Sequence, residues 1–476
     1  EIHERLVGSE MCIRDRDNET ENKGLDFGGG NIPKLFRILF FPTLAAMVFD
    51  ALFIIVDGIF IGHGVGPSGI AAISIVSPLF AIVSGTGLMF GIGASVLASI
   101  SMAKKQIGEA DKTITQAFTV GTLLMFLIAT LCFFFAGNVV EFLGCSDTLE
   151  AYCINYLHWL LPGIVFLMFQ YIGMMLIRLD GSPKYAMFCN VIPGIVNVVL
   201  DWVFIFPLEL GVKGAAMATS ISCVLGGSMA LFYFFRLSEV LNFARLKLSI
   251  AEICDAAHRA WAIIRIGFAT LLTELAMSVM LFTANHVFIR TLGDNGVAAF
   301  SIACYLFPFL FSVNNSVSEA IQPIISFNFG AGNIKRVRTA LHTALIAALI
   351  CGAIEVTAIA GGAEYIVMMF LNPGTEAFDL AVDGLPKFAL CGIFFALNIA
   401  FIGYYQAMKK SVTATAFTLL RGMIFVVPCL LWLPDLIGIP GLWLAIPVSE
   451  LLTLIAILVN HYFFDYKNVF FKVKPV

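Results

Sequence analysis

The stretch IGHGVGPSGIAAISI, from Ile61 to Ile75, returns at Ile289 to Ile302 as IRTLGDNGVAAFSI, one residue shorter. Beyond that gap matching residues are 227 positions apart, and the offset still holds where GVKGAAMATSIS (211–222) lies over GIPGLWLAIPVS (438–449). Small residues recur by chance in apolar helices, but one offset kept over about 150 residues indicates a duplicated chain.

The composition places both copies in a membrane. The 476 residues are 59% hydrophobic and 13% charged, against roughly 45–50% and 25% in soluble domains, which excludes an ordinary soluble protein. Apolar runs near the ~20 residues that cross a bilayer lie at 35–61, 70–99, 113–136, 152–177, 185–206, 214–235, 261–289, 297–327, 339–361, 380–407, 412–433 and 441–464. We therefore predict an all-α integral membrane protein with twelve transmembrane helices.

The period of the duplication fixes how the two halves are related. It spans six helices, an even number, so both halves enter the membrane in the same direction. We expect two parallel six-helix lobes related by a pseudo-two-fold axis along the membrane normal, as in secondary transporters that bind substrate between their repeats. The expected segments are a polar, disordered leader (1–32), an N-terminal lobe (33–237), a cytoplasmic linker (238–260), a C-terminal lobe (261–465) and a cytoplasmic tail (466–476).

Charged residues between the spans predict the orientation. Fifteen Lys and Arg residues fall in one set of loops, and only Lys213 and Arg290 fall in the alternate set. Positive loops stay in the cytoplasm, so we expect both termini there and the protein in the plasma membrane, the inner membrane of a bacterium. The net charge of −4, without a long basic run, gives no support for a nucleic-acid partner. Eleven scattered cysteines predict neither a disulfide framework nor a zinc site.

Four polar residues share one depth in the first lobe. Ionisable residues inside spans are costly and usually functional. Asp57 on the first span, Asn197 and Asp201 on one face of the fifth, and Thr219 on the sixth lie in one layer, roughly 8–10 Å from the outer ends at ~1.5 Å per residue. This site could hold Na⁺, or share a proton, because two close carboxylates in low dielectric do not both ionise. The alternative is a structural polar clamp between helices.

The duplication checks this interpretation. Asp57 corresponds to Asn285, while the other three positions correspond to Ile424, Pro428 and Ile446. Only the first lobe keeps the acids, as expected of a coupling site and not of generic packing.

Other ionisable residues within spans leave two interpretations open. Asp50, seven residues before Asp57 on nearly the same face, either extends a proton path or faces water. Glu274 and Glu319 of the second lobe either meet a cationic substrate or bond to a neighbouring helix. Glu355 and Glu450 are further acids of that lobe, and Arg421 is expected to pair with one of its acids.

Together these segments resemble the multidrug and toxic compound extrusion (MATE) family from about Pro33 to Phe464. The likeness is carried by VDGIFIGHGVG (56–66), IRLDGSPKYAM (177–187), NVVLDWVFIF (197–206), GVKGAAMATSIS, QPIISFNFGAG (322–332) and LLRGMIFVVP (419–428). The resemblance implies a monomer without a cofactor, surrounded by membrane lipid, that exports organic cations and amphipathic drugs in exchange for inward H⁺ or Na⁺.

The family's cation site maps onto Asp57, Asn197, Asp201 and Thr219. One departure favours H⁺ slightly over Na⁺: the family often has an Asn four residues before Arg178, and here that position is Met174. Some relatives use an acid on the seventh helix, for which Glu274 is the nearest counterpart.

Competing functions require features that the chain lacks. A phosphate loop with Gly-Lys-Ser/Thr is absent, which excludes an ATP-driven pump for this chain alone. The seven His residues are isolated and His-Glu-x-x-His is absent, so we do not expect an enzyme. An ion channel is disfavoured by the acids' confinement to one lobe. A lipid-linked oligosaccharide flippase of related architecture is the main alternative. It would show a basic cavity, whereas basic residues within spans are almost confined to Arg421 and Lys387.

Overall fold

The computed structural model describes residues 25–145, 149–245 and 250–466, and within these ranges the secondary structure is helical, without a strand. Eleven helical segments are long and apolar enough to cross a membrane. One of them belongs to α9 (Ile250–Gly330), which has 81 residues and turns at Gly293, where φ is 62°. Since α9 crosses twice, the described helices make twelve crossings, as predicted from the apolar runs.

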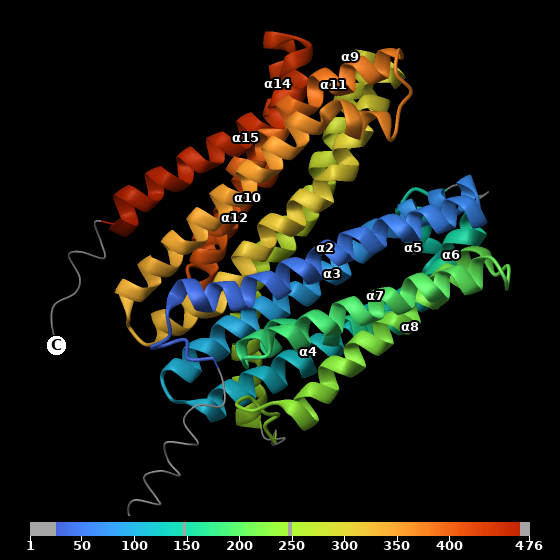
Figure 1. The fold of residues 1–476 in the computed structure, drawn as a ribbon. Coiled ribbons are helices and arrows are strands. Elements are labelled where there is room, and N and C mark those ends of the chain that lie inside the picture. Colours follow the sequence, from blue (N-terminus) through green and yellow to red (C-terminus); the bar gives the residue numbers. More distant parts are fainter. Residues whose placement is uncertain (1–24, 146–148, 246–249, 467–476) are drawn as a thin grey trace, which may run out of the picture.

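The helices form two groups that follow the order of the chain (Figure 1). The first contains α2 (Ile32–Gly64), α3 (Pro67–Ala103), α4 (Ile107–Phe134), α5 (Ala136–Phe142), α6 (Glu150–Leu179), α7 (Pro183–Ile205), α8 (Gly211–Phe232) and the π-helical η1 (Tyr233–Leu237). The second contains α9, α10 (Ile334–Met368), α11 (Glu376–Ala389), α12 (Cys391–Ala407), α13 (Ser411–Leu419), η2 (Leu420–Ile424), α14 (Val426–Ile437), α15 (Ile439–Asn460) and η3 (His461–Tyr466). These groups are the two expected lobes, except that α9 begins at Ile250, so the second half of the expected linker (238–260) is helical and continues into the second lobe.

The turns between helices repeat with the duplication. Gly66 and Gly293 have φ of 85° and 62°, and Gly211 and Gly438 have φ of 57° and 69°. Both pairs are equivalent positions in the two copies. A positive φ is easily reached only by glycine, so these turns require the glycines that the sequence repeats.

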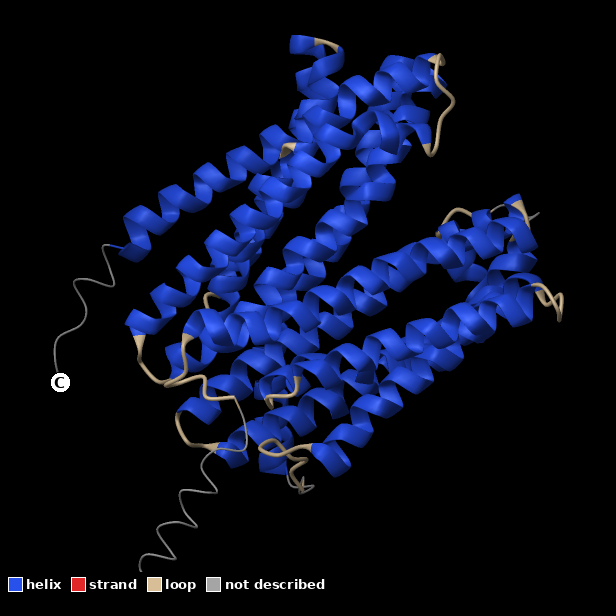
Figure 2. Cartoon of the chain, viewed as in Figure 1, coloured by secondary structure: helices blue, strands red, loops and turns tan. Residues whose placement is uncertain are grey.

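The lobes converge at one end of the bundle and diverge at the other (Figures 1 and 2). We call the end where α2 begins and α15 ends the terminal face, and the opposite end the distal face. One apolar core joins both lobes in the terminal half and includes Met89 of α3 with Ile263 and Ile321 of α9. A separate core around Phe288 and Trp443 lies within the second lobe alone. The molecule is therefore V-shaped, held together near the terminal face.

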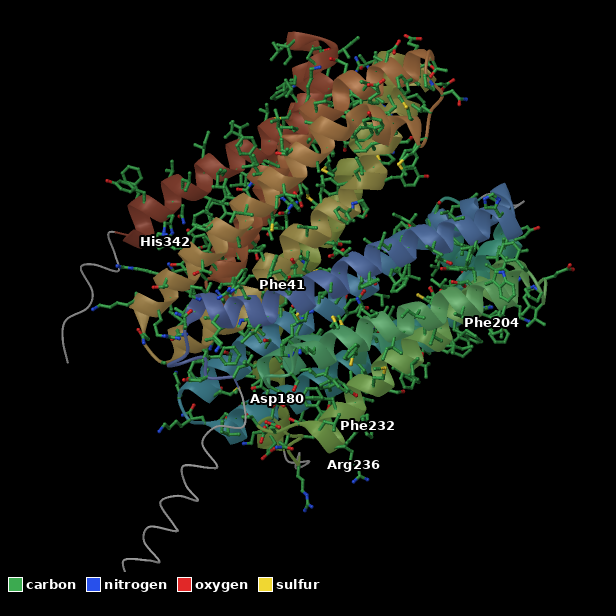
Figure 3. The ribbon with its side chains drawn as sticks, in the orientation of Figure 1. Phe41, Asp180, Phe204, Phe232, Arg236 and His342 are labelled. Carbon is green, nitrogen blue, oxygen red and sulfur yellow. The ribbon has the colours of Figure 1, made fainter. Side chains whose placement is uncertain are left out.

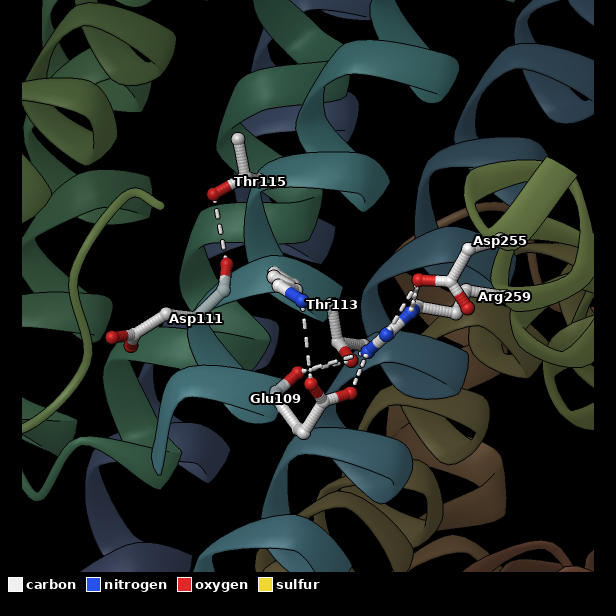
Figure 4. A network of polar contacts seen from close by, with 7 residues as sticks. Glu109, Asp111, Thr113, Thr115, Asp255 and Arg259 are labelled. Atoms are coloured by element: carbon white, nitrogen blue, oxygen red, sulfur yellow. Dashed lines mark hydrogen bonds and ion pairs between the residues drawn. The ribbon is translucent and has the colours of Figure 1, made fainter. Parts of the chain in front are cut away.

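Polar contacts at the terminal face reinforce this junction. The Arg259 guanidinium of α9 lies 2.6 Å from Glu109 Oε2 of α4 and 2.6 Å from Asp255 Oδ2 one turn earlier on α9 (Figure 4). One turn before the end of α3, Ser99 Oγ donates a hydrogen bond to the Pro323 carbonyl of α9.

The structure differs from the expectation of a disordered leader reaching residue 32. Phe27 is 3% exposed, and its carbonyl accepts hydrogen bonds from Asn328 Nδ2 at 2.9 Å and Arg336 Nη2 at 3.0 Å. The short stretch from Leu25 to Gly30 contains three glycines, which suggested a leader, yet the Phe27 ring packs 5.9 Å from the Phe327 ring of the second lobe. Residues 1–24, and the tail after Tyr466, lie outside the described residues.

Candidate coupling site and central cavity

Asp57 and Asp201 meet where α2 packs against α7. Asp57 lies seven residues before the end of α2, and Asp201 lies four residues before the end of α7. The two carboxyl groups interact electrostatically, and Asp201 is 0% exposed. Equal depth on two packed helices brings these residues together, as the depth argument predicts.

As two carboxylates, these groups cannot satisfy each other, because neither carries a hydrogen to donate. Both oxygens of Asp201 and Oδ1 of Asp57 are buried without a hydrogen-bond partner. No Lys or Arg of the described chain forms an ion pair with either acid. A buried, unpaired charge is strongly unfavourable, so this arrangement calls for a proton or a small cation between the acids.

Asn197 and Thr219 lie near the pair but contribute unequally. Asn197 is one turn before Asp201 on α7, and its Nδ2 is buried without a partner. Thr219 on α8 uses its hydroxyl hydrogen within its own helix, donating to the Ala215 carbonyl at 3.0 Å. Only the lone pairs of the Thr219 oxygen therefore remain for a ligand.

Tyr156 is a member of this layer that the sequence argument missed. It is 8% exposed on α6, and its phenol interacts electrostatically with both Asp57 and Asp201. Tyr156 lies six residues after Glu150, roughly 9 Å into the helix at ~1.5 Å per residue. The same depth count, applied to hydroxyl-bearing aromatic residues, would have found it.

Asp50 lies elsewhere on α2, beside the side chain of Asn190 from α7. Asn190 Nδ2 donates to the Ala46 carbonyl at 3.1 Å, and Asn190 Oδ1 accepts from Gln170 Nε2 at 3.1 Å. Asp50 is exposed, and its two interpretations, a proton path or contact with water, both stay predictions. The amides Asn190 and Gln170 were not singled out from the sequence.

A cavity of about 20 Å³ lies between the two halves of α9 and α12, which is room for about one water molecule. Glu274, Thr273, Phe311, Asn315, Ser318 and Glu319 are among the residues that line it. Glu274 forms no ion pair with any described residue. It is thus the acid of this cavity whose charge is not balanced.

Glu319 is balanced from the opposite lobe. Arg178 Nη1 of α6 lies 2.5 Å from Glu319 Oε2, and the two side chains are 4% and 3% exposed. Asn315 Nδ2 donates to the other carboxylate oxygen at 3.2 Å. In this conformation Glu319 therefore bonds to a neighbouring helix and does not present a bare charge to a substrate. The sequence placed Arg178 among the fifteen basic residues of the cytoplasmic loops, but it is buried in the last turn of α6.

The second lobe contains two further buried polar groups. Arg421 Nε lies 2.7 Å from Glu450 Oε1, and Asn398 Nδ2 donates to Glu450 Oε2 at 2.7 Å. Arg421 thus pairs with an acid of its own lobe, as expected. Glu355 accepts hydrogen bonds from the Asn314 amide. Asn285, the counterpart of Asp57, is exposed on α9.

Asp180 is a further buried residue that was not singled out from the sequence. Its carboxylate accepts bonds from the Tyr233 hydroxyl at 2.6 Å, from Ser238 Oγ, and from the backbone N–H groups of 239, 240 and 241. Figure 3 places Asp180 at the terminal face, opposite Phe204 toward the distal face. Asp180 fastens the end of α6 to the chain that follows η1, and its place in IRLDGSPKYAM was the available signal.

Comparisons with known proteins agree with this architecture. The MatE family profile matches twice, at residues 42–203 and 269–431, so the matches begin 227 residues apart (269 minus 42), the offset of the duplication. The multidrug export protein MepA of Staphylococcus haemolyticus (strain JCSC1435) is 24% identical over 409 residues, covering 86% of this chain and 88% of MepA. MepA of Staphylococcus aureus (strain NCTC 8325 / PS 47) is 24% identical over 420 residues, covering 88% and 91%.

Solved structures show the same fold. An outward-facing multidrug resistance MATE family transporter of the MOP superfamily has a TM-score of 0.85 at 21% identity, over 92% of this chain and 97% of that chain. A MOP superfamily transporter from Pyrococcus furiosus has a TM-score of 0.84 at 21% identity, with the same coverage. With the family profile matching more than half of its length in two copies, the chain belongs to the MatE family of multidrug and toxic compound extrusion transporters.

Proposed function

We propose that this transporter is a secondary antiporter that exports organic cations and amphipathic drugs in exchange for inward protons. The observation that carries the proposal is the neighbouring pair of Asp57, which is half-buried, and Asp201, which is fully buried. Three of their four carboxyl oxygens are buried without a hydrogen-bond partner, and neither acid has a counter-charge among the described residues. Such a pair is stable when it holds a proton and unfavourable when both groups are ionised. Its state can therefore follow the proton gradient.

Protons are favoured over Na⁺ by the oxygen ligands near the pair. On α6, the position where the family often has an Asn is Met174, which is 5% exposed. A thioether is a poor ligand for a hard cation, which prefers oxygen. Na⁺ is the alternative coupling ion.

The V shape gives the antiport a physical route. With the terminal face in the cytoplasm, as the charge asymmetry indicates, the lobes are joined on the cytoplasmic side and diverge toward the outside. Uptake of one proton would remove the repulsion between two ionised carboxylates and change the contact between α2 and α7. A drug is exported if it binds one arrangement of the lobes better than the other, because a ligand shifts a conformational equilibrium only by its differential affinity.

The flippase alternative lacks support from the buried basic residues. A pyrophosphate-linked substrate needs basic groups able to bind phosphate. The buried Arg178 and Arg421 are each paired with a glutamate, at 2.5 and 2.7 Å. Lys387 pairs with Asp383 at 2.6 Å in α11, with the Asp383 side chain largely exposed. The names of the relatives, multidrug export proteins, also support drug export.

The test is drug-driven proton movement in proteoliposomes. Purified protein is reconstituted with a pH-sensitive dye inside, and a lipophilic organic cation such as ethidium is added with a proton gradient or with a Na⁺ gradient alone. We expect proton movement that depends on the cation and on the protein, without a requirement for Na⁺. If Na⁺ alone drives cation uptake, the coupling ion is Na⁺ and not the proton. If neither gradient drives cation movement, the proposed antiport is refuted.

A further inference from the structure

Glu355, at the middle of α10, is a second buried carboxylate without a counter-charge. It is 5% exposed, and Asn314 Nδ2 of α9 lies 3.2 Å from Glu355 Oε1 and 2.9 Å from Oε2. No Lys or Arg in the described ranges forms an ion pair with it. One amide is a weak substitute for water around a full charge, so an ionised Glu355 is unfavourable here.

The other groups around Glu355 do not supply the missing charge. Cys351 on α10 and Cys391 on α12 are the titratable groups that face it, and both are neutral as thiols. Arg421 also interacts with Cys391, but it is bonded to Glu450. An ionised Glu355 therefore leaves this region of the lobe with one uncompensated negative charge.

The hydrogen-bond partners point to a proton as the ligand. Asn314 is 0% exposed, and its Oδ1 is buried without a hydrogen-bond partner. A protonated Glu355 has an O–H that can donate to this carbonyl, whereas the ionised form cannot. A hard metal cation takes about six oxygen ligands, and Glu355 with Asn314 supplies only three.

The Glu355–Asn314 pair is not a polar contact that both copies of the duplicated chain share. At the offset of 227 residues, Glu355 and Asn314 correspond to Ile128 and Gly87 in the first lobe. The pair is thus specific to the second lobe, as Asp57 and Asp201 are specific to the first. Asn315, the residue that follows Asn314 on α9, lines the central cavity together with Glu274 and Glu319. The Glu355–Asn314 pair therefore lies next to this cavity along the sequence of α9.

We propose that Glu355 and Asn314 form a second proton-binding site, in the C-terminal lobe, and that each transport cycle takes up two protons. This inference rests on the proposed proton antiport and sets its stoichiometry. The Asp57–Asp201 pair takes one proton, and Glu355 takes the other.

The stoichiometry is measured as the steady-state gradient of a monovalent organic cation in proteoliposomes, with the membrane potential clamped at zero. A pH difference of about one unit is a tenfold proton gradient, so two protons per cation sustain about a 100-fold cation gradient and one proton about a tenfold gradient. We expect about 100-fold for the wild type and about tenfold for Glu355→Gln, which keeps the shape but takes up no proton. The matched control is Glu364→Gln, an exposed acid on the same helix, for which we expect the wild-type gradient.

A second variant tests the same site in case Glu355→Gln does not fold. Asn314→Leu removes the amide that stabilises the ionised form, so Glu355 stays protonated and the gradient also falls to about tenfold. Size-exclusion profiles and melting curves identify which variant is folded. Wild-type gradients in folded Glu355→Gln or Asn314→Leu would overturn the second site and leave the antiport intact. A wild type that builds no gradient would instead refute the proposed function.

Discussion

The ion pair between Arg178 and Glu319 makes a quantitative prediction about the conformational equilibrium. It joins α6 of one lobe to α9 of the other, near the terminal face, with both side chains at most 4% exposed. Removing one partner from a buried ion pair costs about 3–5 kcal/mol, because the other charge is left uncompensated. If the pair separates when the terminal face opens, Arg178→Leu shifts the equilibrium toward the open terminal face by up to roughly 100- to 4,000-fold. This is an upper limit, since the surroundings of Glu319 can rearrange once Arg178 is absent.

The assay is a distance measurement between spin labels on the two lobes at the terminal face. Lys184 at the start of α7 and Thr339 near the start of α10 are exposed positions for the labels. We expect a dominant short distance in the wild type and a longer one in Arg178→Leu. The double variant Arg178→Leu/Glu319→Leu should return most of the population to the short distance, because apolar replacement of a whole buried pair is often nearly neutral. An unchanged distance distribution in the single variant would refute the reasoning.

Three further predictions concern coupling, backbone strain and orientation. Asp201→Asn should stay folded but lose coupled efflux, and uphill transport at the wild-type rate would contradict the site. Lys105→Gly should raise the free energy of unfolding by about 0.5–1 kcal/mol, because Lys105 has φ of 60° where the second copy has Gly332 with φ of 73°; an unchanged or lower melting temperature would disprove this. A cysteine at Arg245 should be protected from an impermeant reagent outside intact cells while one at Lys213 reacts, and the reverse pattern would invert the proposed orientation.

Several features of the fold and the site could be predicted because they depend on regular geometry. The fixed rise of a helix placed Asp57 and Asp201 at one depth, and the repeat offset gave the two lobes and the equivalent turns. Apolar length alone gave the twelve crossings.

The remaining features depend on how helices rotate and tilt against one another. Arg178 and Glu319 are 141 residues apart, and nothing in the spacing shows that the last turn of α6 faces α9. The contact of Phe27 with the second lobe was hidden for the same reason, because its partners Asn328 and Arg336 are about 300 residues away in sequence. Packing between lobes requires the three-dimensional structure.

The central claim is that the Asp57–Asp201 pair couples proton binding to drug export without contacting the drug. The most direct measurement is the affinity of purified Asp57→Asn for an organic cation, compared with the wild type between about pH 6 and pH 8. We predict that the variant binds within about tenfold of the wild type but loses the pH dependence, because the drug acts only through its preference between lobe arrangements. A variant that keeps the wild-type pH dependence would place the coupling elsewhere, with Glu274 the next candidate, and a variant that no longer binds would make Asp57 a drug ligand.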